Sequence, residues 1–238
     1  MRLFLKLCAV AAFTCVSAGV ASADTIQLGS YGTGDASMGD SNTAVDYDGY
    51  SATSTTPASG VGSTYTLASG ALWQIPVVNS TWVGYAPTAG PVGTVNPAMG
   101  YYTFTTSFTA GSAGPYSGSL NIMADDTAEV FLNGNLLVSF GAQGSDARCA
   151  DVAPNCVTVD TIPLTGLTLL GGSDANTFTF VVLQTGEGPT GGTGDPTGVD
   201  FSSLLSSVPE PSSLLLLATG MLGCAATIRR RYAPSGNL

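Results

Sequence analysis

Residues 128–140 read AEVFLNGNLLVSF, a pattern typical of a β-hairpin. Two short runs of apolar residues lie on either side of Asn133 and Gly134. Asn-Gly is the strongest short signal for a β-hairpin, because both residues tolerate the positive φ of a type I′ turn. The sequence therefore predicts strands at 128–132 and 136–140 that turn back on one another.

Further strands are predicted on both sides of this hairpin. Residues 101–108 (YYTFTTSF) alternate aromatic side chains with Thr or Ser, and residues 119–124 alternate again. Residues 177–183 have the composition of a buried strand. Gly and Pro turns are frequent, and no stretch before the C-terminal tail shows a convincing helical stripe. The region is therefore expected to be all-β.

The order of these strands resembles a known sandwich. An aromatic strand at 101–108, a second strand at 118–122, and the "ADD" corner and "VFLNG" hairpin within 124–134 are similar to the galactose-binding-like jelly roll. Residues 197–201 would be the returning last strand. The resemblance implies a single jelly-roll-like β-sandwich over residues 24–206, clearest over 70–205. It implies little about function, because this architecture serves many tasks.

The C-terminal tail carries a second resemblance. An apolar run at 214–228 is followed by three arginines. Before it stand four residues that are expected to form a cleavage motif: Val208, Pro209, Glu210 and Pro211. This order resembles the PEP-CTERM sorting signal of Gram-negative surface proteins, here over residues 207–232 with a short tail at 233–238. The resemblance implies processing by an exosortase and release or attachment at the cell surface.

The physical chemistry of the tail agrees with a sorting signal. The two prolines have no backbone N–H and keep the preceding residues extended, as a protease substrate requires. The run at 214–228 is expected to be a short transmembrane helix, since about 20 apolar residues is the usual length. The arginines would stay on the cytoplasmic side. An ordinary C-terminal anchor that is never cleaved remains the alternative.

The N-terminal segment is predicted to be a signal peptide. Two basic residues precede an apolar stretch, and Ala21-Ser22-Ala23 fits the small-residue cleavage rule. Cleavage is expected before Asp24, so residues 1–23 would be removed after export by the Sec machinery. The precursor would then be held in the inner membrane by its tail.

The charge of the exported region is strongly negative. Between Asp24 and Glu210 the chain contains all 16 acidic residues and one basic residue, Arg148, for a net charge of −15. One cation cannot neutralise a phosphate backbone, so nucleic-acid binding is excluded. Neutral glycans, divalent cations and cationic partners remain as ligand classes.

Two cysteines lie in the exported region. Cys149 and Cys156 are isolated in the sequence, and an oxidising compartment favours a disulfide between them. A metal site would need more ligands, and the chain contains no histidine.

An acidic loop near the start of the domain is a candidate calcium site. Four aspartates and two glycines occur within 15 residues, and calcium prefers such hard oxygen ligands on a loop that contains glycine. The candidate ligands are Asp35, Asp40, Asp46 and Asp48. Their spacing does not match an EF-hand, and a solvated acidic loop without a metal ion is the competing interpretation.

Three aromatic residues are candidates for stacking on a sugar ring. Trp82 and Tyr85 lie in a loop-like setting, and Tyr101 begins the aromatic strand. Aromatic side chains are also the commonest fillers of a sandwich core. Both interpretations are open for these residues.

A catalytic site is not expected. The chain has no histidine for a Ser-His-Asp or Cys-His arrangement. Consecutive residues of a strand point to opposite faces, so Asp125 and Asp126 are expected to shape a corner rather than to act together.

The sequence therefore predicts an exported, non-catalytic surface or matrix protein with a carbohydrate-binding or adhesive domain. The alternatives are a structural matrix component without a ligand and, more distantly, a carboxylate-dependent glycan hydrolase.

Overall fold

The computed structural model describes residues 23–35, 42–54, 62–94, 96–141, 158–185 and 195–208, and four residues of the tail (219, 220, 222 and 223). Residues 23–208 form one compact unit, and the two terminal segments belong to a separate unit. The signal peptide and most of the expected membrane helix lie outside the described residues. Within the described part, no helix is long and apolar enough to cross a membrane.

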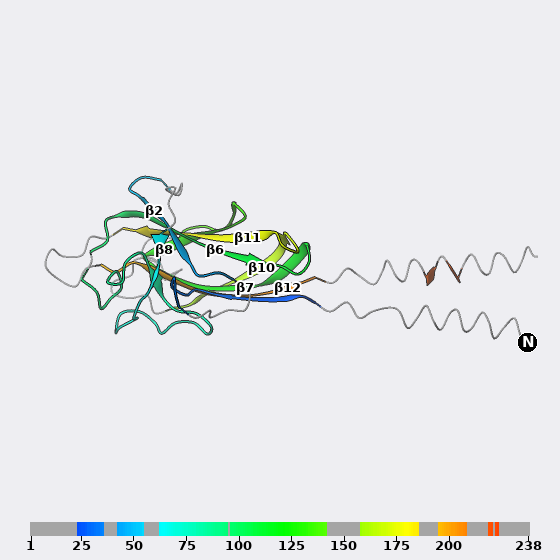
Figure 1. The fold of residues 1–238 in the computed structure, drawn as a ribbon, viewed down its shortest axis with the longest axis horizontal. Helices are drawn as coiled ribbons and strands as arrows, with labels where there is room; N and C mark the ends of the chain where they lie inside the picture. Colours follow the sequence, from blue (N-terminus) through cyan, green and yellow to red (C-terminus); the bar gives the residue numbers. More distant parts are fainter. Residues whose placement is uncertain are drawn as a thin grey trace, which may run out of the picture. The chain divides into compact units, whose positions relative to one another are not determined.

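The described residues 23–208 form two six-stranded antiparallel sheets that lie face to face (Figure 1). Sheet A has the order β10-β7-β12-β5-β4, with β1 also paired to β12. Its strands are β10 (Asp160–Leu169), β7 (Gly114–Asp125), β12 (Gly198–Ser207), β5 (Val83–Gly84), β4 (Tyr65–Thr66) and β1 (Thr25–Gly29). Sheet B, in order, contains β3 (Gly62–Ser63), β2 (Asp46–Ser51), β6 (Gly100–Thr109), β11 (Ala175–Gln184), β8 (Thr127–Leu132) and β9 (Asn135–Val138). The predicted all-β sandwich is confirmed.

The hairpin that the sequence predicts is present. β8 pairs with β9, and Leu132 lies opposite Asn135 across the turn. Asn133 and Gly134 have φ values of 50° and 78°, as a type I′ turn requires. The side chain of Asn133 also binds the neighbouring strand, because its Oδ1 accepts a hydrogen bond from Thr177 N at 2.9 Å. The turn is therefore attached to β11 as well as to its own hairpin.

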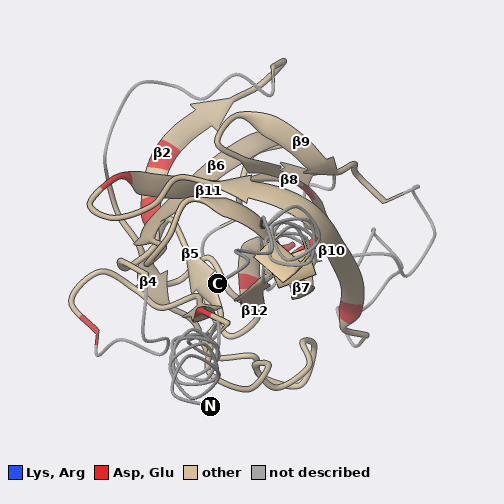
Figure 2. Cartoon of the chain, turned by 90° about the vertical axis from the view of Figure 1, so that its right-hand side faces the viewer, with Lys and Arg blue, Asp and Glu red and all other residues tan. Residues whose placement is uncertain are grey.

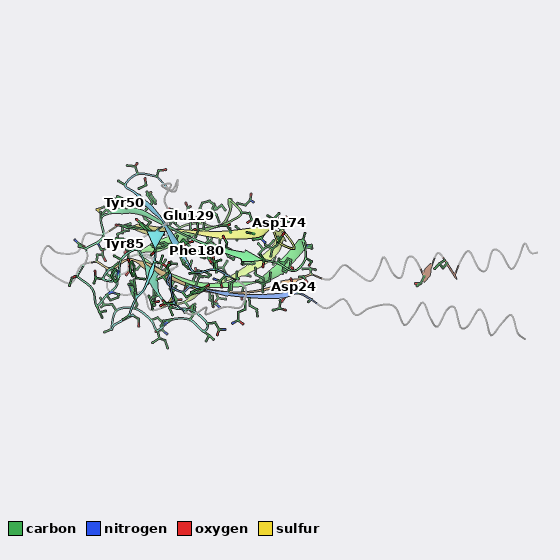
Figure 3. All side chains as sticks on the ribbon, viewed as in Figure 1. Asp24, Tyr50, Tyr85, Glu129, Asp174 and Phe180 are labelled. Atoms are coloured by element: carbon green, nitrogen blue, oxygen red, sulfur yellow. The ribbon has the colours of Figure 1, made fainter. Side chains whose placement is uncertain are left out.

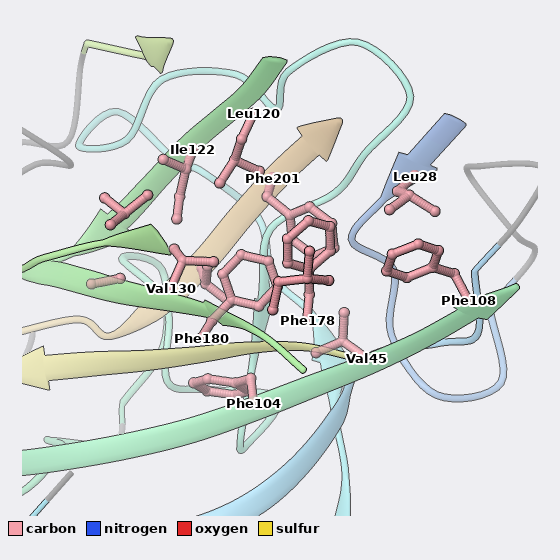
Figure 4. Packing of buried hydrophobic residues seen from close by; sticks show 14 of the residues in the cluster. Leu28, Val45, Phe104, Phe108, Leu120, Ile122, Val130, Phe178, Phe180 and Phe201 are labelled. Carbon is pink, nitrogen blue, oxygen red and sulfur yellow. The ribbon is translucent and has the colours of Figure 1, made fainter. Parts of the chain in front are cut away.

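Aromatic side chains from both sheets fill the space between them (Figure 4). Phe104 and Phe108 come from β6, Phe178 and Phe180 from β11, and Phe201 from β12. The two sheets meet where Phe180 stacks on Phe201, with ring centroids 4.3 Å apart. Period-two alternation along these strands directs the aromatic rings inward, so the core follows from the pattern in the sequence.

A second apolar cluster covers the outer face of sheet A. Met123 points away from the main core, and the segment after β4 folds over it with Leu67, Trp73, Trp82 and Ala89. The two indole rings stack with centroids 4.1 Å apart. The long segment between β4 and β6 is therefore a packed layer.

The contact between the sheets should dominate stability. Phe180→Ala removes a fully buried ring and should lower the free energy of unfolding by about 3–5 kcal/mol. Leu204→Ala on β12 is the control, because this side chain is 50% exposed and its loss should cost no more than about 0.5 kcal/mol. Urea unfolding measures both variants, and equal losses would contradict this packing.

Candidate cation and ligand site

Three carboxylates converge at one corner of the sandwich. Oxygen atoms of Asp125, Asp126 and Asp195 all lie within 4.8 Å of one another. Among the described residues, this is the group of acidic side chains that could hold a metal ion. Calcium binds oxygens at 2.3–2.6 Å, so ligands around one ion are at most about 5 Å apart. The spacing of the three carboxylates fits one calcium ion.

The ends of two adjacent strands form this corner. Asp125 is the last residue of β7 and pairs with Gly198, the first residue of β12, and Asp195 lies three residues before Gly198. The sequence predicted that Asp125 and Asp126 point to opposite faces, and this prediction was wrong. β7 ends at Asp125 and β8 begins at Thr127, so Asp126 lies in the corner between them and the alternation of a regular strand does not apply.

Hydrogen bonds fix two of the carboxylates from several directions. The indole of Trp73 donates to Asp125 Oδ2 at 2.6 Å. The backbone N–H and the hydroxyl of Thr185 both donate to Asp126 Oδ2, at 2.6 and 2.8 Å. Thr197 donates to the backbone carbonyl of Asp125 at 2.9 Å. The outer layer, β11 and β12 therefore all position this acidic corner.

Close packing supports the Trp73 contact. A Cβ atom on Gly198 would lie 2.9 Å from the indole of Trp73 and 3.0 Å from the carbonyl oxygen of Val83. Only glycine allows the start of β12 to approach the indole this closely. The start of β12 therefore requires glycine at position 198, beside the acidic corner.

The environment of these carboxylates opposes negative charge. Burial raises the pKa of Asp125 well above its usual range, and the neighbouring Asp126 raises it further. Asp126 is fully buried, whereas Asp195 is partly exposed. The described residues contain no Lys, Arg or His, and Figure 2 accordingly shows acidic residues in red and no basic ones. A bound cation would remove the mutual repulsion and favour the ionised carboxylates.

The described aspartates of the expected calcium-binding loop do not lie on one loop in the structure. Asp46 and Asp48 lie on β2, and Asp35 accepts a hydrogen bond from the hydroxyl of Thr66. These three carboxylates do not form a group of metal ligands among the described residues, and Asp40 lies outside them. The described side chains thus place the candidate cation site at Asp125, Asp126 and Asp195.

Trp82 occupies a core position, not a ligand-binding position. Its side chain is fully buried, and its Nε1 donates to the carbonyl oxygen of Gln74 at 2.9 Å. One face of the indole is stacked on Trp73. The stacking role expected for Trp82 does not fit this geometry, because neither ring face is open to a sugar.

The structure does not bring Tyr85 and Tyr101 together. Tyr85 stacks on the buried ring of Tyr102 with centroids 4.9 Å apart. Tyr101 lies on the opposite face of β6, where the centroid of its ring is 6.0 Å from that of Phe140. Both remain partly exposed, and Tyr50 is 37% exposed beside Tyr102. Figure 3 shows Tyr50 and Tyr85 at the end of the sandwich opposite Asp24 and Asp174.

Strand register places the tyrosines at the same end as the acidic corner. Tyr101 pairs with Leu183 on β11, and Leu183 pairs with Thr127, the residue after Asp126. Two strand spacings separate Tyr101 from Thr127, or about 10 Å. The rings of Tyr47, Tyr85 and Tyr102 pack on one another, and burial together with the neighbouring phenols raises the pKa of Tyr47 to about 12.

A buried carboxylate lies under the outer layer. Asp200 accepts hydrogen bonds from the hydroxyls of Ser30 and Ser80 and, at 2.9 Å, from Val77 N. Burial raises its pKa to about 6, although these hydrogen bonds lower it in part. These hydrogen bonds attach the outer layer to Asp200 on β12.

The tail carries the feature that assigns the chain to a sorting pathway. Its residues 207–231 match the model described as the PEP-CTERM protein-sorting motif. The chain carries a PEP-CTERM sorting motif. The motif indicates an exported protein made as a membrane-anchored precursor and sorted to the cell surface, and it implies exosortase processing. Pro209, Glu210 and Pro211 of the motif, like Cys149 and Cys156, lie outside the described residues.

Comparisons of the whole PEP-CTERM chain give weaker likenesses. No curated protein matches the sequence. A GH26-CBM35 β-(1,4)-mannanase from Podospora anserina is 15% identical over 50% of this chain and 24% of its own, with a TM-score of 0.27. A β-glucosidase from Kluyveromyces marxianus is 19% identical over 48% of this chain and 12% of its own, with a TM-score of 0.28. A PA14 sugar-binding domain from an RTX adhesin is 14% identical over 44% and 45%, with a TM-score of 0.23. At these scores the likenesses support no further conclusion.

The raised pKa of Asp200 predicts the direction of pH dependence. The fold favours its protonated form, so its stabilising contribution is complete below about pH 4 and is lost as pH rises through about 6. Without metal ions, stability should therefore increase from pH 7 to pH 5, by up to about 1.4 kcal/mol per pH unit from this group. Asp200→Asn should reduce this increase, and thermal unfolding at both pH values measures it.

Asp174→Asn provides the control for this measurement. Asp174 is exposed in the turn before β11 and should leave the wild-type pH dependence unchanged. An Asp200→Asn variant with the wild-type pH dependence would show that Asp200 titrates normally.

Proposed function

We propose that this exported protein is a non-catalytic cell-surface protein of a Gram-negative bacterium whose sandwich binds neutral glycans through calcium. Asp125, Asp126 and Asp195 would hold the ion. The observation that carries the proposal is the convergence of these three carboxylates within 4.8 Å, in a described chain without basic residues.

The chemistry of calcium favours a hydroxyl-bearing ligand. Calcium takes about six to eight oxygen ligands, so three carboxylates leave coordination positions for other oxygens. Vicinal sugar hydroxyls can supply such oxygens. Acidic polymers would be repelled, because the sequence between residues 24 and 210 has a net charge of −15. A neutral polysaccharide at the cell surface meets both requirements.

Partly exposed tyrosines add a second type of contact. Tyr101, Tyr50 and Tyr85 lie at the acidic end of the sandwich, and the phenol of Tyr50 already donates to the carbonyl oxygen of Met99 at 2.6 Å. Its ring, rather than its hydroxyl, is therefore the surface offered to a ligand. Aromatic ring faces suit the C–H faces of pyranose rings. We assign Tyr101 to the ligand-facing surface, Tyr85 to a separate, partly exposed group of rings around Tyr102, and Trp82 to the core.

Binding fits this geometry better than hydrolysis. Glycoside hydrolysis requires two carboxylates on either side of the scissile bond, one as an acid and one as a nucleophile or base. Here the three carboxylates face one another at one point, and Asp126 is fully buried and bonded to Thr185. A shared cation explains this convergence, whereas a substrate between them has no room.

The proposed route follows from the two ends of the chain. The Sec machinery would export the precursor, and residues 1–23 would be removed as a signal peptide. An exosortase would act at Val208, Pro209, Glu210 or Pro211, with residues 214–228 in the inner membrane until then. Cys149 and Cys156 would form a disulfide in this oxidising compartment.

Calcium should stabilise the protein, and this stabilisation should depend on the acidic corner. At a calcium concentration 100 times Kd, the stabilisation is about 2.7 kcal/mol, or a rise in Tm of about 5–10 °C. Asp195→Asn should lower calcium affinity at least about tenfold, since it removes one ligand charge. Titration calorimetry and melting with calcium or a chelator measure both effects.

The matched control is again Asp174→Asn, which removes one charge at the other end of the sandwich. It should bind calcium like the wild type. Affinity should also fall on acidification, because protons compete for Asp125, whose pKa is already raised. A wild-type protein without a calcium-dependent melting shift would refute the cation site.

Glycan binding should require calcium and an aromatic ring at position 101. On an array of neutral glycans and the host exopolysaccharide, the mature protein should bind with calcium and not with a chelator. Tyr101→Ala should weaken binding by about 1–3 kcal/mol if a sugar stacks on this ring, by analogy with other ring-stacking contacts. Tyr101→Phe keeps the ring and should retain binding. Calcium binding without any glycan would favour a structural matrix role.

A further inference from the structure

The sorting motif begins inside the folded domain. Ser207 is the last residue of β12 and the first residue of the motif. Its N–H donates to the carbonyl oxygen of Asp24 at 2.8 Å, and its hydroxyl accepts from Asp24 N at 2.7 Å. The next residue, Val208, donates its N–H to the carbonyl oxygen of Pro115 at 2.9 Å. The first two residues of the motif are thus hydrogen-bonded to β7 and to the residue that precedes β1.

Asp24 is itself held in place. Its Oδ2 accepts hydrogen bonds from the hydroxyl of Tyr116 and from Gly111 N, both at 2.8 Å. Tyr116 is fully buried and lies opposite Ser207 in the β7–β12 pair. The end of β12 is therefore clamped from both sides by residues far from it in the sequence.

We propose that release of Ser207 and Val208 from this clamp controls processing of the sorting motif. The partner is a protease that binds the motif as an extended segment. Such an enzyme needs backbone groups on both sides of its cleavage point, and Pro209 and Pro211 offer no N–H. The nearest upstream N–H groups, those of Ser207 and Val208, are bonded within the sandwich. Cleavage of a native segment follows the fraction of molecules in which it is locally open.

This inference is independent of the glycan site. Asp125 and Gly198 pair at one end of β7 and β12, and Tyr116 and Ser207 pair at the other. Ten strand residues span about 30 Å, so the acidic corner and the clamp do not share side chains. Changes at the clamp should alter processing and leave calcium binding unchanged.

The test compares a locked and a released clamp in the full-length precursor, expressed in a host with its exosortase. Thr25→Cys with Ser206→Cys places two thiols directly across β1 and β12, outside the motif. In a pulse-chase measurement, the oxidised double variant should be processed at least about threefold more slowly, and a reductant should restore the rate. Each single cysteine variant should be processed at the wild-type rate.

A second variant keeps the test valid if the cysteine pair impairs folding. Six Gly/Ser residues inserted between Ser206 and Ser207 move the whole motif away from the clamp and keep its residues 207–231 continuous. Processing should become at least about threefold faster, because the upstream segment no longer has to open. The same insertion after Gly34, in an exposed turn outside the motif, is the control and should not accelerate processing. Wild-type processing rates in both the oxidised double variant and the insertion after Ser206 would overturn the proposal.

Discussion

The structure depends on β12, the last strand of the sandwich and a central strand of sheet A. β7 pairs along one side of it from Gly198 to Ser207, and β1 and β5 pair along the other. β12 therefore joins the beginning, the middle and the end of the domain. Val199, Phe201 and Leu205 on its inner face complete the main core, and Asp200 on its outer face holds the covering layer. Folding of sheet A requires pairing between residues at opposite ends of the domain sequence, which is a slow kind of contact to form.

The second constraint is charge. The described residues include no basic side chain, so a buried carboxylate must be stabilised by hydrogen-bond donors or by an external cation. Asp24 and Asp200 are stabilised by donors, because hydroxyls and backbone N–H groups surround them. Asp125 also has a donor in Trp73, but the adjacent carboxylates raise its pKa well above the usual range. Burial raises the pKa of Asp200 as well, so the difference is that two further carboxylates converge on Asp125. This convergence separates a cation site from a structural network.

The sequence predicted those parts of the fold that depend on local pattern. Asn133-Gly134 identified its hairpin, and the aromatic alternation of residues 101–108 identified β6, because both signals act within a few residues. β10 was missed, since Pro163 and a positive φ at Gly166 interrupt its pattern on an edge strand. The register shift of β10 between Leu164 and Leu167 also interrupts the alternation that would identify a strand.

The candidate site was harder to predict than the fold. Asp195 lies about 70 residues from Asp125, and only the β7–β12 register brings them together. The rule of alternating faces, applied to Asp125 and Asp126, assumes that both belong to one strand, whereas β7 ends at Asp125. Trp82 was assigned to a loop from its polar neighbours, although the loop is folded onto sheet A and buries it. An adjacent acidic pair at the end of one strand and an aspartate just before the next were the available signals, and neither fixes a distance.

The register between β7 and β12 therefore fixes the geometry at both ends of the sandwich. Asp125 opposite Gly198 forms the acidic corner, and Tyr116 opposite Ser207 closes the clamp. A shift of β12 by one residue would turn every side chain to the other face. Asp200 would then enter the aromatic core, Phe201 would leave Phe180, and Ser207 would lose Asp24. Because the core strongly opposes such a shift, it fixes the geometry at both ends, and at the clamp Tyr116 is itself part of the core. Ligand binding and sorting can thus be changed separately by substitutions at the ends, but both depend on the aromatic contact between them.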